Sequence, residues 1–292
     1  MELALFAAVV LAVVVAALAR AYAPLSDAAV HEWADAHGLR LTTENGGLVR
    51  RHLRSARILR TWGGVAGVAL PALVELAWHG RLTLLGFGAD GEHNPGGIGW
   101  VFAGYLAGAL LAELRLARPT GGARRAAALI PRELSDYLPR GVLWAQRGLA
   151  AVAALGLLAV ALVPYGERHA QPDKAPLLLG AVLVVLLAVA LEALERRLVR
   201  RAQPFTGASL LAADDAIRAQ AVHSVAGAGL ALLLLLTSGI ALGLTQSDVD
   251  ALRLTMWFPA SVAFGLALRA CGEVGHRAWR VRRGGEAGAA PA

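Results

Sequence analysis

Long apolar runs alternate with short charged connections along the chain. The runs lie near residues 3–19, 61–78, 97–112, 148–163, 175–191, 222–244 and 254–268. About 20 apolar residues are enough for a helix to cross a bilayer. Backbone polar groups in lipid must be satisfied within the chain, and the alternating pattern of a barrel strand is absent. The pattern therefore predicts an all-α fold, a polytopic membrane helix bundle of about seven transmembrane helices.

The run at 254–268 is the shortest of the seven. As a helix it rises about 22 Å, which is less than the roughly 30 Å of a hydrocarbon core. Arg253 and Arg269 bracket it, and their long side chains can reach the two interfaces. We therefore count it as a span.

The first run has two interpretations. "ARAYAP" at its end is similar to a signal-peptidase site, so cleavage of residues 3–19 is the alternative. However, Glu2 stands where a signal peptide carries basic residues, and the connection that follows is rich in arginine. We favour a retained first helix.

The composition supports a membrane protein. Hydrophobic residues make up 57% of the 292 residues and charged residues 17%, against about 25% charged in soluble domains. The net charge is +7, but Lys174 is the single lysine, and this arginine bias is typical of a GC-rich coding sequence. No aromatic-basic interleaving or reader motif accompanies the charge, so we expect no nucleic-acid binding.

The positive charges are distributed unevenly between the two sides of the predicted bundle. Twenty-four of the 28 basic residues lie in the connections after the first, third and fifth spans and in the tail. By the positive-inside rule these segments are cytoplasmic. We expect the N-terminus on the outer side and the C-terminus on the cytoplasmic side of the cell membrane. Residues 1–272 form one integral membrane domain with a long basic loop at 20–60, and 273–292 form a basic, then low-complexity tail that we expect to be disordered.

A short helix is predicted within the first connection, in "PLSDAAVHEWADAHG". Ser26 or Asp27 can cap its start and Gly38 can end it, and Thr42 or Thr43 offers the next cap. Helical spacing aligns one apolar stripe, formed by Leu25, Ala29, Trp33 and Ala36. The favoured interpretation is a helix at the membrane interface with Trp33 anchored there. The alternative is docking to a partner protein.

Two groups of residues could form a metal site, and neither interpretation is favoured. His31, Glu32, Asp35 and His37 are close in sequence, but the histidines are six residues apart and point to different helix faces, unlike the i, i+4 pair of a zinc site. The two outer loops hold Asp90, Glu92, His93, Glu167, His169 and Asp173, which could meet around a divalent cation. The favoured alternative is two solvated turns rich in Gly, Pro and Asp.

Ionisable residues avoid the middle of the predicted spans. Glu75 lies near an outer end. Inner ends hold Glu113, Glu192, Glu195, Gln146, Arg147 and His223, where we expect the carboxylates to pair with arginines and stay hydrated. Ion-coupled transporters and intramembrane hydrolases need such groups at depth. Walker, nucleophile-elbow and dinucleotide motifs are also absent, so we expect no enzyme activity, no cofactor and no metal.

Two sequence patterns bear on helix packing. Gly63–Gly67 and Gly104–Gly108 are small-xxx-small pairs that permit close helix approach. "RPTGGARRAA" at 118–127 recurs in outline as "QPFTGASLLAADD" at 203–215. One interpretation is a duplicated two-helix unit. The other is that any span ending inside needs arginines to stop it, and proline and glycine to turn the chain.

The stretches "HEWADAHGLRLTTEN", "RELSDYLPRG" and "AADDAIRAQAVHSVAGAGLAL" resemble segments of an uncharacterised family of actinobacterial multi-pass membrane proteins. The resemblance implies an integral membrane protein of a high-GC bacterium, and it brings no activity and no site residues. In "AADDAIR", Asp214 and Asp215 fit an interfacial helix start, because acids favour the first turn.

The functional expectation follows from these features. We predict a non-enzymatic membrane protein that acts through partner proteins at its arginine-rich cytoplasmic face. The alternative is a permease, or permease subunit, for a small solute, which could bind through backbone groups at broken helices. An intramembrane enzyme is the least favoured class.

Overall fold

The computed structural model is a bundle of long helices. It describes residues 2–79, 83–84, 87–88, 97–116, 125–126, 133–164, 174–201, 203–204, 207–245 and 247–273. The helices are α1 (Glu2–Tyr22), α2 (Asp27–Ala36), α3 (Gly46–His79), α4 (Gly97–Leu116), α5 (Arg140–Leu162), α6 (Lys174–Arg200), α7 (Ala208–Leu244), α8 (Asp250–Thr255) and α9 (Trp257–Glu273), with a 3₁₀ turn, η1 (Leu134–Asp136). This confirms the all-α prediction.

The described strands are two residues long and form two antiparallel pairs. β1 (Thr83–Leu84) pairs with β2 (Phe87–Gly88) between α3 and α4. β3 (Arg125–Ala126) pairs with β4 (Gln203–Pro204), so that Arg125 lies opposite Pro204. The two proline- and arginine-containing connections whose sequences recur are therefore neighbours in space, and whether they arose by duplication stays a prediction.

Several helices are long and apolar enough to cross a membrane. Among the described residues these are Arg140–Leu162, Leu177–Arg200, Ala208–Leu244 and Asp250–Ala270. A fifth candidate is the pair Ala7–Tyr22 and Asp27–Ala36, bent by 75°. The last of the four contains the predicted short span at 254–268 and extends it. The number seven stays a prediction.

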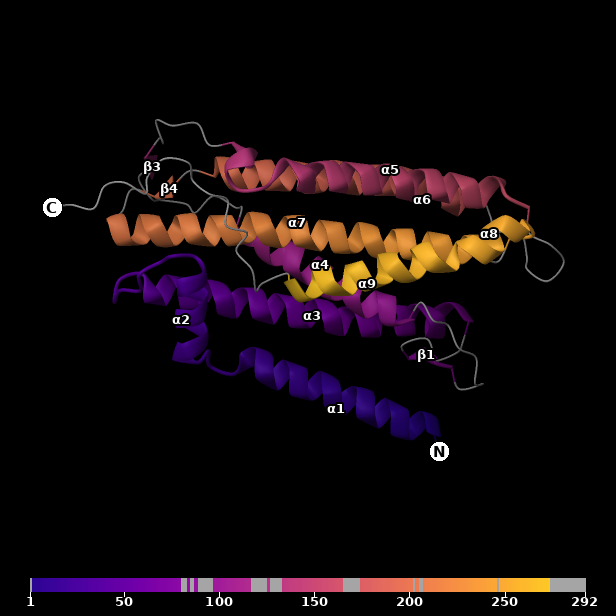
Figure 1. The fold of residues 1–292 in the computed structure, drawn as a ribbon. Coiled ribbons are helices and arrows are strands. Elements are labelled where there is room, and N and C mark those ends of the chain that lie inside the picture. The colour runs from indigo at the N-terminus through magenta and orange to yellow at the C-terminus, as the bar shows by residue number, and fades with distance from the viewer. Residues whose placement is uncertain are drawn as a thin grey trace.

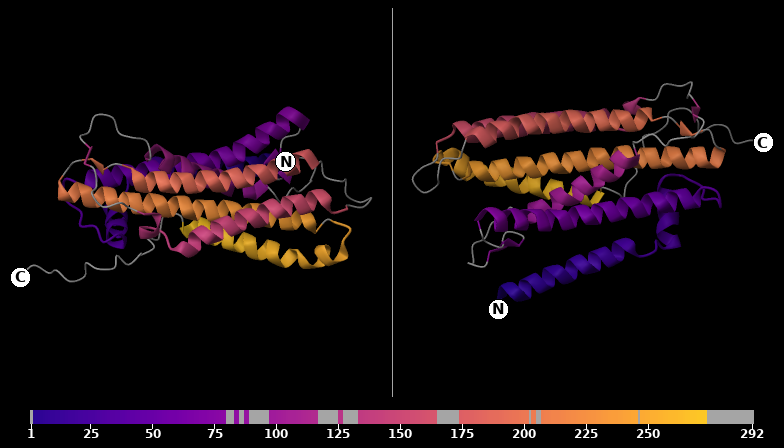
Figure 2. Two further views of the ribbon diagram at one scale, coloured as in Figure 1. Left: turned by 90° about the horizontal axis from the view of Figure 1, so that it is seen from above. Right: turned by 180° about the vertical axis from the view of Figure 1, so that it is seen from behind.

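Helix α7 is the central element of the bundle. It contacts α4, α5, α6 and α9, while α3 packs most extensively against α4. Figures 1 and 2 show the long helices side by side. The segment α2, the starts of α3 and α7, and β3 and β4 gather at one end, whereas β1 and α8 lie at the other. The described parts of the first, third and fifth connections therefore meet at the same end.

The glycine pairs of α3 and α4 face each other, so the close helix approach that their spacing permits is made between these two helices. A Cβ added at Gly63 would come within 2.2 Å of the Gly104 carbonyl oxygen, and one at Gly67 within 2.2 Å of the Trp100 carbonyl oxygen. A Cβ at Gly108 would lie 2.3 Å from the Leu59 carbonyl oxygen. The backbones of the two helices are thus in direct contact, and the absence of side chains at these positions is what allows it.

Large apolar side chains cover much of the outer surface. On α6 the exposed positions include Leu179 at 60% and Val189 at 61%. On α5 they include Leu155 at 65%, and on α1 Leu11 at 64%. An exposed apolar surface of this extent marks a membrane or protein contact, and its spread over several long helices fits lipid.

Helices α3 and α7 are longer than a bilayer requires. With 34 and 37 residues they rise about 51 and 55 Å, against roughly 30 Å of hydrocarbon. Their first turns therefore extend beyond an apolar layer centred on the bundle. There they enclose a separate apolar cluster with α2, formed by Val30, Trp33, Ala34, Leu39, Val49, Ala213 and Ile217.

The sequence predicts the ends of α2 correctly but misplaces its buried face. Ser26 caps the helix by accepting a hydrogen bond from Ala29 N at 3.3 Å, and Gly38 follows it with φ +63°. The buried residues are Val30, Trp33 and Ala34, rather than a stripe through Ala29 and Ala36, which are exposed. Trp33 is only 7% exposed, because α3 and α7 cover it, so its side chain is an anchor within the protein and not a membrane-interface residue.

Candidate functional site

We take the polar assembly at the arginine-rich end as the candidate site and call it the arginine-rich layer. It comprises residues 23–60, 133–139, 195–201 and 207–224. Three connections that are far apart in sequence build it, and its apolar cluster is the one formed by α2, α3 and α7. Hydrogen bonds and ion pairs join its parts.

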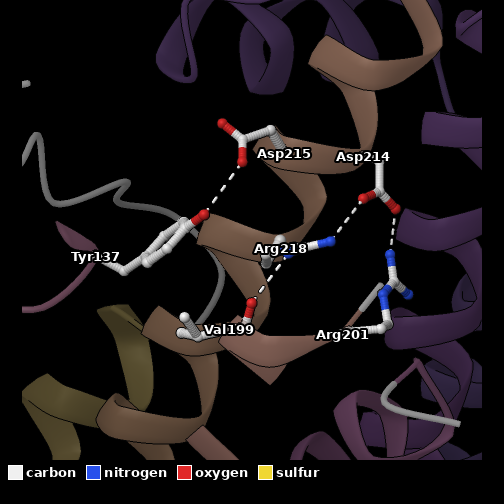
Figure 3. Close-up of polar contacts among 6 residues, drawn as sticks. All are labelled: Tyr137, Val199, Arg201, Asp214, Asp215 and Arg218. Carbon is white, nitrogen blue, oxygen red and sulfur yellow. Dashed lines mark hydrogen bonds and ion pairs between the residues drawn. The ribbon is translucent and has the colours of Figure 1, made fainter. Parts of the chain in front are cut away.

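Asp214 joins the end of α6 to the second turn of α7 (Figure 3). Arg218 donates to its Oδ2 from Nη2 at 3.0 Å, and Arg201 forms an ion pair with its other oxygen. Arg218 also donates from Nη1 to the Val199 carbonyl oxygen at 3.0 Å. Asp214 and Arg218 are 7% and 2% exposed. The predicted role of Asp214 in a helix start is therefore wrong, because α7 begins at Ala208 and has no acid in its first turn.

The η1 segment is held on the same helix by Tyr137. Its hydroxyl donates to Asp215 Oδ1 at 3.2 Å, as Figure 3 shows. About two turns further along α7, His223 Nε2 donates to the Tyr137 carbonyl oxygen at 2.8 Å. The third connection is thereby fixed to α7 at two points.

A chain of polar side chains links α2 to α7, α3 and α4. His37 Nε2 lies 3.0 Å from Gln220 Oε1, and Gln220 Nε2 donates to Ser224 Oγ at 3.2 Å. Arg60 donates to the same hydroxyl at 3.2 Å and lies 3.8 Å from Glu113 Oε1. Because its members come from four helices, this chain fixes the position of α2 against the bundle.

Asn45 closes the turn between α2 and α3. Its amide donates to the Arg40 carbonyl oxygen at 3.0 Å and to the Ser209 carbonyl oxygen at 3.4 Å. Its Oδ1 accepts from Thr42 N at 2.8 Å, and Thr42 Oγ1 in turn accepts from Asn45 N at 3.3 Å. Thr42 therefore caps the turn that leads into α3 rather than α3 itself, which begins at Gly46, and Asn45, which is 1% exposed, ties this turn to α7.

Two of the three glutamates expected to be hydrated are buried. Glu113 and Glu195 are both 0% exposed. Glu195 accepts from Gln146 Nε2 at 3.0 Å rather than from an arginine, and the same amide nitrogen lies 3.2 Å from the Ala226 carbonyl oxygen. Only Glu192 fits the expectation, since it pairs with Arg147 at 2.6 Å and with Arg196. The expectation failed because position at a helix end does not indicate which face a neighbouring helix covers.

His52, which lies in the layer and outside the predicted spans, has a strongly shifted pKa. Burial, together with the positive charges of Arg60 and Arg201 and the neighbouring His37, lowers its pKa from 6.5 to about 4. Among the residues that the structure describes, its Nε2 has no hydrogen-bond partner. The imidazole is therefore neutral near pH 7 and contributes packing rather than charge.

The structure separates the residues of the first metal hypothesis. His31 Nδ1 bonds to the Asp27 carbonyl oxygen at 2.8 Å on an exposed part of α2, whereas His37 turns inward, stacks on Trp33 at 4.2 Å and meets Gln220. No described group of three or more His, Cys, Asp or Glu side chains is placed to hold a metal ion. The second hypothesis concerns loop residues that lie outside the described residues.

A groove between α3 and α4 opens on the surface of the layer. Its volume is about 320 Å³, and its lining residues are Arg51, Arg54, Ser55, Ile58, Leu59 and Arg115. The first five lie on one face of α3, and Arg115 is in the last turn of α4. Guanidinium groups and a hydroxyl over an apolar floor can bind a phosphate or carboxylate.

Sequence reasoning identified the arginine-rich end but not its internal contacts. The short motif "DDAIR" does contain a usable signal, because Asp214 and Arg218 are four residues apart and form an i, i+4 pair. The contact between His37 and Gln220 spans 183 positions and has no local signature.

Searches against protein-family models, curated proteins and solved structures gave no match.

Proposed function

We propose that this chain is a cell-membrane protein of seven spans, with its N-terminus outside, and that it acts without catalysis through a partner protein at the arginine-rich layer. The observation that carries the proposal is that this layer is folded. It has its own apolar cluster and a partly buried hydrogen bond from His37, directly after α2, to Gln220 of α7. A rigid charged surface outside the bilayer is suited to recognising a protein.

The gathering of three arginine-rich connections at one end supports the proposed orientation. Seven spans place the first, third and fifth connections on one side, and positively charged connections stay in the cytoplasm. Their described parts contact one another through Tyr137 and Asp215 and through His37 and Gln220. The opposite end holds β1 and α8 (Figure 1).

The permease alternative has less support. A permease needs polar groups that meet its solute near the middle of the membrane. Among the described residues, the buried charged side chains lie toward the arginine-rich end: Glu113, Glu195, Asp214 and Arg218. This arrangement favours a structural platform over a transport path.

The partner hypothesis can be tested by site-specific photocrosslinking in the native membrane. A photoreactive residue at Glu32 or Arg40, both exposed on the layer, should give the same protein adduct. Asp248, exposed at the other end, is the matched control and should not give it. The adduct should weaken when Arg197 and Arg200 are changed to Glu. Equal adducts from all three positions, or none from Glu32 and Arg40, would contradict the proposal.

A further inference from the structure

The groove between α3 and α4 holds a surplus of positive charge. Several arginines elsewhere in the layer have carboxylate partners: Arg50 pairs with Asp27 at 2.6 Å, and Arg201 and Arg218 share Asp214. Within the described residues, no carboxylate pairs with Arg51, Arg54 or Arg115. Three uncompensated guanidinium groups around one hollow leave a strongly anion-attracting site.

Charged and apolar residues lie at opposite ends of the groove along the bundle axis. Helix α3 runs from the arginine-rich end into the apolar part, so Ile58 and Leu59 lie one turn closer to the bilayer than Arg54 and Ser55. Helix α4 runs the opposite way. Its exposed Leu111, at 53%, and Leu114, at 38%, precede Arg115 on the bilayer side. Charge therefore lines one end of the hollow and an apolar surface leads away from the other.

We propose that this groove binds the headgroup of an anionic phospholipid. The phosphate would accept hydrogen bonds from the three guanidinium groups, whose planar donors match phosphate oxygens, and from the Ser55 hydroxyl. The acyl chains would lie over Ile58 and the leucines of α4. The volume of about 320 Å³ accommodates a phosphate with a small polar alcohol, and ligand pockets begin near this size.

A lipid explains the site better than a soluble anion. A free phosphate gains nothing from an apolar floor, whereas a phospholipid matches both halves of the groove. The position also fits, because a basic pocket at the cytoplasmic interface lies at the depth of the headgroups. The lipid site rests on the topology of the proposed function but not on its protein partner, so failure to find a partner adduct would leave the lipid site standing.

The test is retention of lipid by the full-length protein. The wild-type chain is purified from nanodiscs made of equal amounts of phosphatidylglycerol and phosphatidylcholine, and bound lipid is measured by native mass spectrometry. Arg51→Gln, Arg54→Gln and Arg115→Gln together should weaken phosphatidylglycerol binding about 100-fold, since each arginine near an anionic headgroup gives about fivefold. The control variant changes the exposed Arg40, Arg197 and Arg200 to Gln, which removes the same charge elsewhere on the layer.

Three further outcomes decide the proposal. Equal loss in the two variants would overturn it, because general charge would then explain the binding. Equal retention of the two lipids by the wild type would overturn it as well. Soluble glycerol phosphate should displace the lipid poorly. Displacement at concentrations similar to those of the lipid would show a phosphate site without a lipid role, and that result would also overturn the proposal. Unchanged thermal unfolding of the triple variant confirms that it is folded.

Discussion

Asp214 is the residue whose removal should be most damaging to the arginine-rich layer. It compensates Arg218, whose side chain is 2% exposed, and it also pairs with Arg201. A buried ion pair contributes little net stability when complete, but removing one partner leaves a charge stranded in a poorly solvated site. Arg218 keeps its bond to the Val199 carbonyl oxygen, which cannot neutralise it.

Asp214→Asn should therefore lower the free energy of unfolding by about 3–5 kcal/mol. The matched control is Asp35→Asn on the exposed side of α2, for which we expect a change within about 0.5 kcal/mol. Thermal unfolding of both variants in detergent measures the difference. Similar unfolding temperatures for Asp214→Asn and the wild type would show that the ion pair does not hold the layer.

His52 should make the layer sensitive to acid. Its pKa is 6.5 in an ordinary environment and about 4 in the folded protein, so between these values the unfolded chain binds more protons. Its contribution to stability is then fully present above about pH 6.5 and is lost as the pH falls toward 4, with a slope of up to about 1.4 kcal/mol per pH unit.

Replacement of His52 with Leu should reduce this acid sensitivity. Unfolding temperatures of the wild type and of His52→Leu would be compared from about pH 7 to about pH 4.5. The variant should show the flatter dependence, and His31→Leu, at an exposed position, should follow the wild type. Parallel curves for wild type and His52→Leu would refute the assignment.

At the scale of helices, the contact between α3 and α4 depends on glycine. Any Cβ at Gly63 would overlap the Gly104 carbonyl oxygen, so the two backbones would have to separate. Sequence alone identifies the spacing of these glycines, but it does not say which helix they face. Only the structure shows that the pair on α3 meets the pair on α4.

Gly63→Ala should destabilise the protein by about 1–3 kcal/mol, the usual range for overpacking. Gly64→Ala is the matched control on the neighbouring face, where a Cβ would have only an ordinary contact with Tyr105 at 4.0 Å. Chemical unfolding of the two variants measures the difference. A loss of stability in Gly64→Ala equal to that in Gly63→Ala would show that the close backbone contact is not responsible.

The ends of α2 and the positions of the apolar helices are predictable from the sequence, whereas the start of α7, the helix faces and the long-range partners are not. Ser26, Gly38 and Thr42 act through contacts within a few residues, which local sequence encodes. The burial of Glu113 and of Trp33 depends on helices far along the chain. Such burial is decided by tertiary packing, so a single sequence carries no direct signal for it.

At the scale of the whole molecule, the side of the membrane on which the arginine-rich layer lies decides both the partner surface and the lipid site. The arginines, the length of α3 and α7 and the meeting of three connections all favour one folded layer in the cytoplasm. An outside location would remove the proposed partner surface and would place the lipid groove at the wrong leaflet.

Cysteine accessibility in intact cells tests this claim most directly. Cys271 is the single cysteine, so Cys271→Ser gives a background for Arg40→Cys on the layer and Asp248→Cys at the opposite end. A membrane-impermeant maleimide should label the cysteine at position 248 in intact cells, and the one at position 40 only after permeabilisation. Labelling at position 40 in intact cells, with position 248 protected, would contradict the account.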